Sequence, residues 1–246
     1  MTIYDSPVWQ MAKHILPQKF RLKIRNPIIK VIVFFKVCFQ GSYSANREDV
    51  FIEKNLQISG SDTWYLDVGS GHPVIHSNTY KLYKKGAKGV VVDANEFLVD
   101  THRKKRPRDL ACVGACFPDF DKQAEVVFYH LDPWELSTTS DIWYQQALSS
   151  GAMLVSKKIV PNLLLSDLLK QHYPKNTAQK KILNIDVEGM SYGLLNSIDL
   201  NTYPFDLILV ERDSDSDLFM AAADNSISNY EKKGSLGPTD IYSKKF

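Results

Sequence analysis

The residues best suited to chemistry follow an apolar run, in the segment Leu66-Asp67-Val68-Gly69-Ser70-Gly71-His72. Two glycines one residue apart permit positive φ angles and let a ligand touch the backbone with no Cβ in the way. In an open parallel sheet, the turn beyond the carboxyl end of a strand is where nucleotides bind. The segment therefore predicts a nucleotide-like ligand. The alternative is a tight turn that holds none.

The next apolar run, 89–93, ends in Asp93, whose carboxylate could accept hydrogen bonds from both hydroxyls of a ribose. NAD sites also use such an acid, so Asp93 alone does not decide the cofactor. A dinucleotide site needs a third glycine, and the chain has Val74 at that position, after Pro73. S-adenosyl-L-methionine carries no phosphate, and Asp67 suits its cationic end. The loop therefore favours S-adenosyl-L-methionine over NAD.

Two carboxylates, Asp186 and Glu188, lie one residue apart at the end of the run 181–187, and Gly189 then permits a sharp turn. In an extended strand the two side chains point to the same side. Methyl transfer to a hydroxyl needs a base within hydrogen-bond reach. The pair therefore predicts acceptor binding, base catalysis or a divalent cation, although no third metal ligand is evident. The alternative for each carboxylate is a helix cap or a contact with Ser191.

Histidines and a hydroxyl follow the glycines in the same loop. A histidine base titrates near neutral pH, so His76 is a candidate catalytic residue, whereas His72 and His76 could equally hydrogen-bond to backbone or ligand. Ser77 and Asn78 open the next helix. Ser77 is therefore expected to cap it, unless the free helix N-terminus holds the donor's carboxylate instead.

Three further groups have open assignments. The charged run 102–106 either forms a solvated helix face or attracts an anionic acceptor. Trp134, Trp143 and Tyr144 either stack on a sugar or belong to the core. Glu48 and Asp49 either line the site or begin a helix.

The elements that must position these residues are six apolar runs separated by helical stretches, which predict parallel strands with crossover helices. The runs are 64–68, 89–93, 110–115, 125–131, 181–187 and 206–211. Since they are apolar on both pleat faces, the predicted fold is α/β, with a mostly parallel central sheet covered by helices on both faces. Residues 132–160 interrupt the alternation as an insertion, and a last strand at 240–246 is expected to be antiparallel.

Composition limits the class of protein. At 246 residues, with 44% hydrophobic residues and 24% charged, the chain fits one large domain at 51–246 preceded by an extension at 1–50. Its three cysteines form no Cys-x-x-Cys pair, which argues against a disulfide framework or zinc and for the cytoplasm. The net charge is +2, of which residues 1–50 carry +5 and the remainder −3. A nucleic-acid partner is therefore not expected.

The positive charge of the extension lies in a basic, apolar segment, 19–39. Its apolar part from Asn26 to Phe39 would make a helix of about 21 Å, too short for a hydrocarbon core of about 30 Å. Peripheral contact with the inner membrane face is one expectation for this segment. The other is docking on the catalytic domain or on a second subunit of a homodimer.

On these residues the chain resembles the FkbM family of methyltransferases. The resemblance covers residues 44–211. It is carried by four stretches, Ser44-Ala45-Asn46-Arg47-Glu48-Asp49, the segment 66–73, the segment 91–95, and 181–195 with the strand 207–211. Ala45, Asn184 and Cys112 depart from the family pattern. The resemblance implies a class I Rossmann-like methyltransferase fold, and methyl transfer from S-adenosyl-L-methionine to a hydroxyl of a sugar, polysaccharide or related natural product.

The expected donor-binding residues combine the glycine turn, its following loop and the ends of the second and third strands. They are Asp67, Gly69, Ser70, Gly71, His72, Ser77, Asn78, Asp93, Ala94, Asn95 and Cys112. The expected catalytic residues are Asp186, Glu188 and His76. The competing hypotheses are a non-catalytic Rossmann-like scaffold and, more remotely, an NAD-linked oxidoreductase.

Overall fold

The computed structural model describes residues 37, 39, 41–56, 62–117, 124–175, 179–212 and 227–245. The basic, apolar segment 19–39 therefore lies outside the described residues, apart from 37 and 39. Within the described ranges, no helix is both long enough and apolar enough to span a membrane.

The main sheet has seven strands in the order β3-β2-β1-β6-β7-β9-β8. Their bounds are β1 (Thr63–Val68), β2 (Lys88–Asp93), β3 (Leu110–Val113), β6 (Lys180–Ile185), β7 (Leu207–Glu211), β8 (Tyr230–Leu236) and β9 (Thr239–Lys244). The first five strands in that order pair in parallel, and β9 runs antiparallel to both β7 and β8. The mostly parallel sheet and the antiparallel last strand are thus confirmed.

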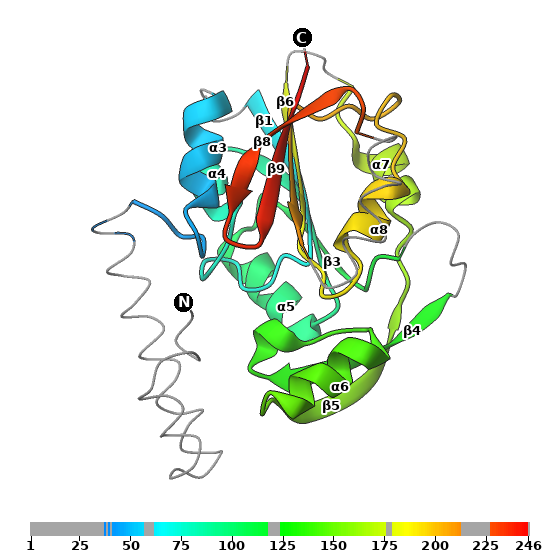
Figure 1. The fold of residues 1–246 in the computed structure, drawn as a ribbon. Coiled ribbons are helices and arrows are strands. Elements are labelled where there is room, and N and C mark those ends of the chain that lie inside the picture. The colour runs from blue at the N-terminus through cyan, green and yellow to red at the C-terminus, as the bar shows by residue number, and fades with distance from the viewer. Residues whose placement is uncertain are drawn as a thin grey trace.

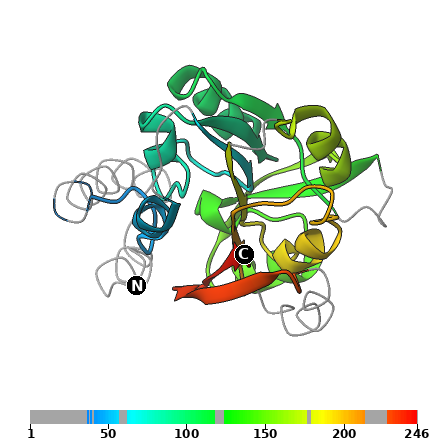
Figure 2. The same cartoon turned by 90° about the horizontal axis from the view of Figure 1, so that it is seen from above.

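Helices cover both faces of this sheet, as expected. Leu66 and Val68 pack in one apolar cluster with α7 (Leu165–His172) and α8 (Ser191–Asn196). Tyr65, on the other pleat face, packs with α3 (Glu48–Leu56), α4 (Tyr80–Lys84) and α5 (Glu96–Lys105). Figure 1 shows the two groups of helices on opposite sides of the strands, and Figure 2 separates α3 (blue) from α8 (yellow) in the view from above.

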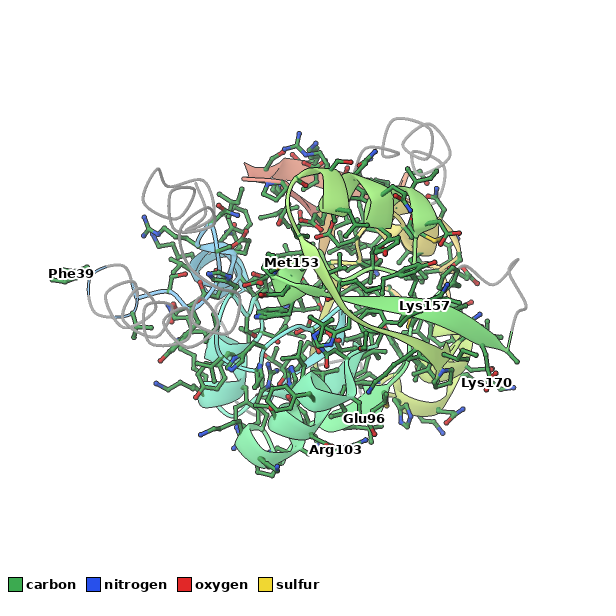
Figure 3. The ribbon with its side chains drawn as sticks, turned by 90° about the horizontal axis from the view of Figure 1, so that it is seen from below. Phe39, Glu96, Arg103, Met153, Lys157 and Lys170 are labelled. Atoms are coloured by element: carbon green, nitrogen blue, oxygen red, sulfur yellow. The ribbon has the colours of Figure 1, made fainter. Side chains whose placement is uncertain are left out.

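The expected insertion, 132–160, is part of a larger separate unit, 124–162, which is called the insertion from here on. Its strands β4 (Glu125–Asp132) and β5 (Met153–Pro161) pair antiparallel in a second sheet, with the 3-10 helix η3 (Trp134–Leu136) and α6 (Asp141–Ser149) between them. This unit lies at the end of the molecule below the main sheet (Figure 1). From below, Met153 and Lys157 mark β5 crossing that end, beside Glu96 and Arg103 on α5 (Figure 3).

The expectation that the run 125–131 joins the parallel sheet is wrong. This strand is apolar on both faces because Val126 and Phe128 pack against Ala115, while Tyr129 and Leu131 pack with Ala147 of α6. Its sequence therefore has the same continuous apolar run as a strand buried in a parallel sheet. The unit enters and leaves the main domain at one point, where the Asn162 N–H donates to the Ala124 carbonyl at 2.9 Å.

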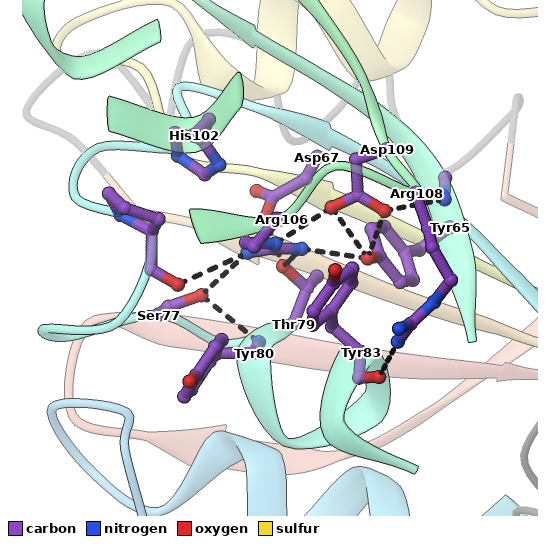
Figure 4. A network of polar contacts seen from close by, with 12 residues as sticks. Tyr65, Asp67, Ser77, Thr79, Tyr80, Tyr83, His102, Arg106, Arg108 and Asp109 are labelled. Carbon is purple, nitrogen blue, oxygen red and sulfur yellow. Dashed lines mark hydrogen bonds and ion pairs between the residues drawn. The ribbon is translucent and has the colours of Figure 1, made fainter. Parts of the chain in front are cut away.

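A buried arginine joins the loop after β1 to the sheet (Figure 4). Arg106, fully buried just after α5, donates from Nε to Asp109 at 2.7 Å and from Nη2 to Tyr65 at 2.8 Å. The same guanidinium donates to the Thr79 hydroxyl at 3.0 Å and to the Ser77 hydroxyl at 3.3 Å. A guanidinium suits this position because its five N–H donors lie in one fixed plane and can bond to several segments at once.

The charge run 102–106 is therefore only partly a solvated face. Arg103, Lys104 and Lys105 are exposed, but His102 and Arg106 are fully buried. The difference follows from the helical period, because residues four apart share a face, and here that face points at the sheet.

Replacing this arginine should destabilise the fold strongly. Arg106→Gln leaves the Asp109 carboxylate buried without its cation, which costs about 3–5 kcal/mol in unfolding free energy. Lys104→Gln, on the exposed face of the same helix, should change it by less than about 0.5 kcal/mol. Urea unfolding measures both, and equal stabilities of the two variants would contradict a structural role for the network.

Candidate functional site

The glycine turn lies at the carboxyl end of β1 and is held against β2. The N–H groups of Gly69 and Ser70 both donate to the Val92 carbonyl, at 2.9 and 3.0 Å. Gly69 has φ 75°, and a Cβ there would lie 1.8 Å from the Asp186 carbonyl oxygen. Glycine is thus required both for the turn and for the close approach of the segment after β6. The turn therefore brings the two predicted parts of the site together.

Asp93 fixes the second glycine. Its carboxylate accepts from the Gly71 N–H at 2.8 Å and from the Asn95 N–H at 2.7 Å. Burial raises the pKa of Asp93 to about 6. Because an ionised carboxylate offers about four acceptor positions, two remain for further donors such as ribose hydroxyls. At neutral pH the Asp93 carboxylate is therefore mostly ionised and can accept further hydrogen bonds at the end of β2.

One polar atom of the turn has no hydrogen-bond partner among the described residues. Ser70 is 7% exposed, and its hydroxyl oxygen is buried without a bond. A buried unpaired hydroxyl costs free energy unless a ligand or water completes it. Together with the glycine backbone and Asp93, this hydroxyl is a polar cradle that fits a nucleoside-type ligand.

Asp67 is turned toward protein groups. One carboxylate oxygen accepts from the Thr79 hydroxyl and the other from the Asn184 amide at 2.9 Å. Asn184, its register partner in β6, accepts in turn from the Asn78 amide at 3.0 Å. Asp67 and Asn78, both predicted to bind the donor, therefore anchor the loop after β1. Their contact with a donor stays a prediction.

The loop histidines differ in role. His72 Nδ1 accepts from the N–H groups of Val74 and Ile75, both at 3.1 Å, so this ring shapes the loop. His76 is half-buried and has φ 57°, a left-handed conformation that histidine adopts more readily than most residues. The expectation that Ser77 is the N-cap of the next helix is wrong, because Thr79 holds that position; the Ser77 hydroxyl lies two residues earlier and accepts from the Tyr80 N–H at 3.1 Å.

Asp186 shares a hydrogen bond with Glu211, at the end of the neighbouring strand β7. Two carboxyl groups that share a hydrogen bond hold one proton between them. The Asp186 side chain is accessible to water, yet the surrounding protein desolvates it and raises the pKa of its carboxyl. A water-accessible carboxyl with a raised pKa is suited to exchanging a proton with a ligand.

The insertion covers both turns of the site. The Trp134 ring lies against Gly71, where a Cβ would be 2.9 Å from it, and the Trp143 ring lies against Gly189, where a Cβ would be 2.2 Å away. The Thr138 hydroxyl donates to the backbone carbonyl of Glu188 at 3.2 Å. Tyr144 instead stacks on another ring of the insertion, with centroids 4.1 Å apart. Of the three aromatics, only the two tryptophans reach the site.

The remaining predicted residues lie beside Asp93 and on the edge strand. Asn95 caps α5 by accepting from the Phe97 N–H at 3.2 Å, and Ala94 packs against the insertion's apolar cluster. Cys112 is half-buried in β3 opposite Val92, and desolvation raises the pKa of its thiol. Glu48 and Asp49 begin α3, the second of their two expected places. Across the described ranges, no three His, Cys, Asp or Glu side chains are arranged to hold a metal ion.

Two residues of the site carry no sequence signal strong enough to single them out. Glu211 ends the run 206–211, and only the rule that carboxyl ends of adjacent parallel strands meet could have paired it with Asp186. The His102 Nε2–H donates to the Gly71 carbonyl at 3.0 Å. Since burial lowers the pKa of His102 to about 3, its ring is neutral and Nε2 is the donor to that carbonyl.

No protein-family model matches the chain, and no curated protein matches it either. Among solved structures, it is similar to a TehB-like SAM-dependent methyltransferase from Corynebacterium glutamicum, at 12% identity and a TM-score of 0.42, covering 93% of this chain and 97% of that one. A candidate methyltransferase from Thermobifida fusca is similar at 10% identity and a TM-score of 0.37, covering 81% of each chain. These likenesses are too distant to bear on activity. The class I methyltransferase fold is assigned on the sheet itself, with its parallel strands and the antiparallel β9 inserted between β7 and β8.

Proposed function

We propose that this protein is an S-adenosyl-L-methionine-dependent methyltransferase of the FkbM type that methylates a hydroxyl of a sugar, polysaccharide or related acceptor. The observation that carries the proposal is the cradle at the end of β1 and β2, made of the Gly69–Gly71 backbone, Asp93 and the unpaired Ser70 hydroxyl. When bound there, S-adenosyl-L-methionine supplies a methyl group on a cationic sulfur.

Each part of the cradle has a task toward the donor. Asp93 accepts from ribose hydroxyls, and the Ser70 hydroxyl completes its hydrogen bonding with the ligand. The two glycines adopt positive φ angles and let the Asp186 backbone and the Trp134 ring lie close against the turn. Val74, in place of a third glycine, favours this donor over NAD.

The acid pair Asp186–Glu211 is suited to take the acceptor's proton. Its ionised carboxylate accepts a hydrogen bond from the acceptor hydroxyl and takes the proton as the oxygen attacks the methyl carbon. Because Gly69 contacts the Asp186 backbone, donor turn and acid pair keep a fixed separation, which favours alignment of the reacting atoms. Trp143, which lies against Gly189 on the turn after Asp186, favours a carbohydrate-like acceptor, since aromatic faces pack well against apolar sugar faces.

Thermal melting with three ligands tests the proposal. S-adenosylhomocysteine or S-adenosyl-L-methionine at 100 times its Kd should add about 2.7 kcal/mol of stability, a rise in Tm of about 5–10 °C at this chain length. NAD at the same concentration should leave the Tm unchanged. A rise with NAD alone would favour an oxidoreductase, and no rise with any ligand would favour a scaffold.

Donor binding should weaken as the pH falls through about 6. Binding to ribose hydroxyls favours the ionised form of Asp93, whose raised pKa means that this form predominates only above that pH. The Kd of S-adenosylhomocysteine should therefore rise about tenfold between pH 7.5 and pH 5 by titration calorimetry. Asp93→Ala should bind weakly at both pH values, while Asp100→Ala, on an exposed turn of α5, should keep the wild-type profile.

Removing the second acid should impair transfer and spare donor binding. Glu211→Gln takes away the proton exchange with Asp186, so the rate of methyl transfer should fall by about 100-fold or more. The measurement is tritium transferred from labelled donor to the best acceptor in a panel of free mono- and disaccharides. Glu96→Gln, exposed on α5, is the matched control. An unchanged rate in Glu211→Gln would exclude the pair from catalysis.

A further inference from the structure

Trp134, in the insertion, lies directly over the donor turn. The six-membered part of its indole contacts Gly71, with Cζ3 and Cη2 2.9 and 3.2 Å from the place of a Cβ. The side chain is half-buried, so part of the ring remains accessible beyond this contact. The six-membered ring of this indole is thus held against the donor loop.

The insertion's own hydrogen bonds fix this position. The Ser137 N–H donates to the Trp134 carbonyl at 3.0 Å, and the Ser137 hydroxyl accepts from the Leu131 N–H at 3.0 Å. Thr138 exchanges two backbone hydrogen bonds with Tyr129, at 2.8 and 3.1 Å. The indole therefore sits on a short segment that is anchored on both sides, and little ordering is needed before it meets a ligand.

The chemistry of the donor indicates which part of it Trp134 faces. The N–H of Gly71 is bonded to Asp93, the residue proposed to hold the ribose. In the donor, a single methylene joins the ribose ring to the sulfonium. A group lying over Gly71 is therefore a near neighbour of that cation, and tryptophan is the side chain whose ring attracts cations most strongly.

We propose that Trp134 is a donor-recognition residue whose indole closes the donor site and attracts the sulfonium by a cation–π interaction. This inference rests on the proposed function. It gives the insertion a role in discriminating the charged donor from S-adenosylhomocysteine, the neutral product. After transfer, the attraction is lost, which favours release of the product.

The same insertion provides a matched control. Trp143 lies against Gly189, on the turn after β6, and not on the donor turn. Both residues are half-buried tryptophans packed on a glycine. A change that acts by loosening the insertion should therefore affect donor binding equally in the two variants.

The test is titration calorimetry with S-adenosyl-L-methionine and S-adenosylhomocysteine on the full chain. Trp134→Leu keeps an apolar cover but removes the π face, so the Kd of the sulfonium ligand should rise about 5- to 30-fold more than that of the neutral one. Trp134→Phe should raise the ratio of the two Kd values less than Trp134→Leu does, because a phenyl ring still attracts cations, although more weakly than an indole. Trp143→Leu should leave the ratio of the two Kd values unchanged.

Three results would overturn the inference. Equal losses for both ligands in Trp134→Leu would reduce the indole to an apolar cover, and an equal change of ratio in Trp143→Leu would assign the effect to the insertion as a whole. If wild-type protein bound neither ligand, the proposed function would fail as well. If the melting curve showed that Trp134→Leu did not fold, the test would use Trp134→Phe. An unchanged ratio of the two Kd values in Trp134→Phe would then overturn the inference.

Discussion

The buried guanidinium of Arg106 is the interaction on which the rest of the site depends. It joins a helix end to β1 through Tyr65 and to the loop after β1 through Ser77 and Thr79. Thr79 in turn bonds to Asp67, directly before the donor turn. A buried cation is costly unless every donor finds a partner. Because these partners come from separate segments, the guanidinium holds the loop in one conformation.

From this junction the site extends across the carboxyl edge of the sheet. The Asp67 carboxylate accepts a hydrogen bond from the Asn184 amide, which ties the end of β1 to β6. The turn at Gly69 contacts the backbone of Asp186, which lies just beyond β6. Donor cradle and acid pair are therefore two parts of one rigid edge. Such preorganisation favours catalysis by alignment, because no large rearrangement has to precede the reaction.

The sequence indicates the main sheet well because strands buried on both faces are continuous apolar runs. The same rule fails at β4, which is buried on both faces within a different sheet. It also misses β5, most of whose side chains are exposed, and β8. In the site, the glycine turn and Asp93 have local patterns. The burial of Arg106 and the pairing of Asp186 with Glu211 depend on contacts between distant segments, which no local pattern encodes.

The insertion's two ends lie side by side, because Glu125 is the register partner of Pro161 and the Asn162 N–H donates to the Ala124 carbonyl. A segment whose ends are adjacent can be lengthened, shortened or exchanged while the sheet beneath keeps its register. Residues 124–162 thus have the geometry of a cassette that can be replaced while the sheet edge beneath it stays constant. Its contacts with Gly71 and Gly189 add a condition: a replacement must fit over two turns whose positive φ angles of 56° and 91° favour glycine whatever covers them.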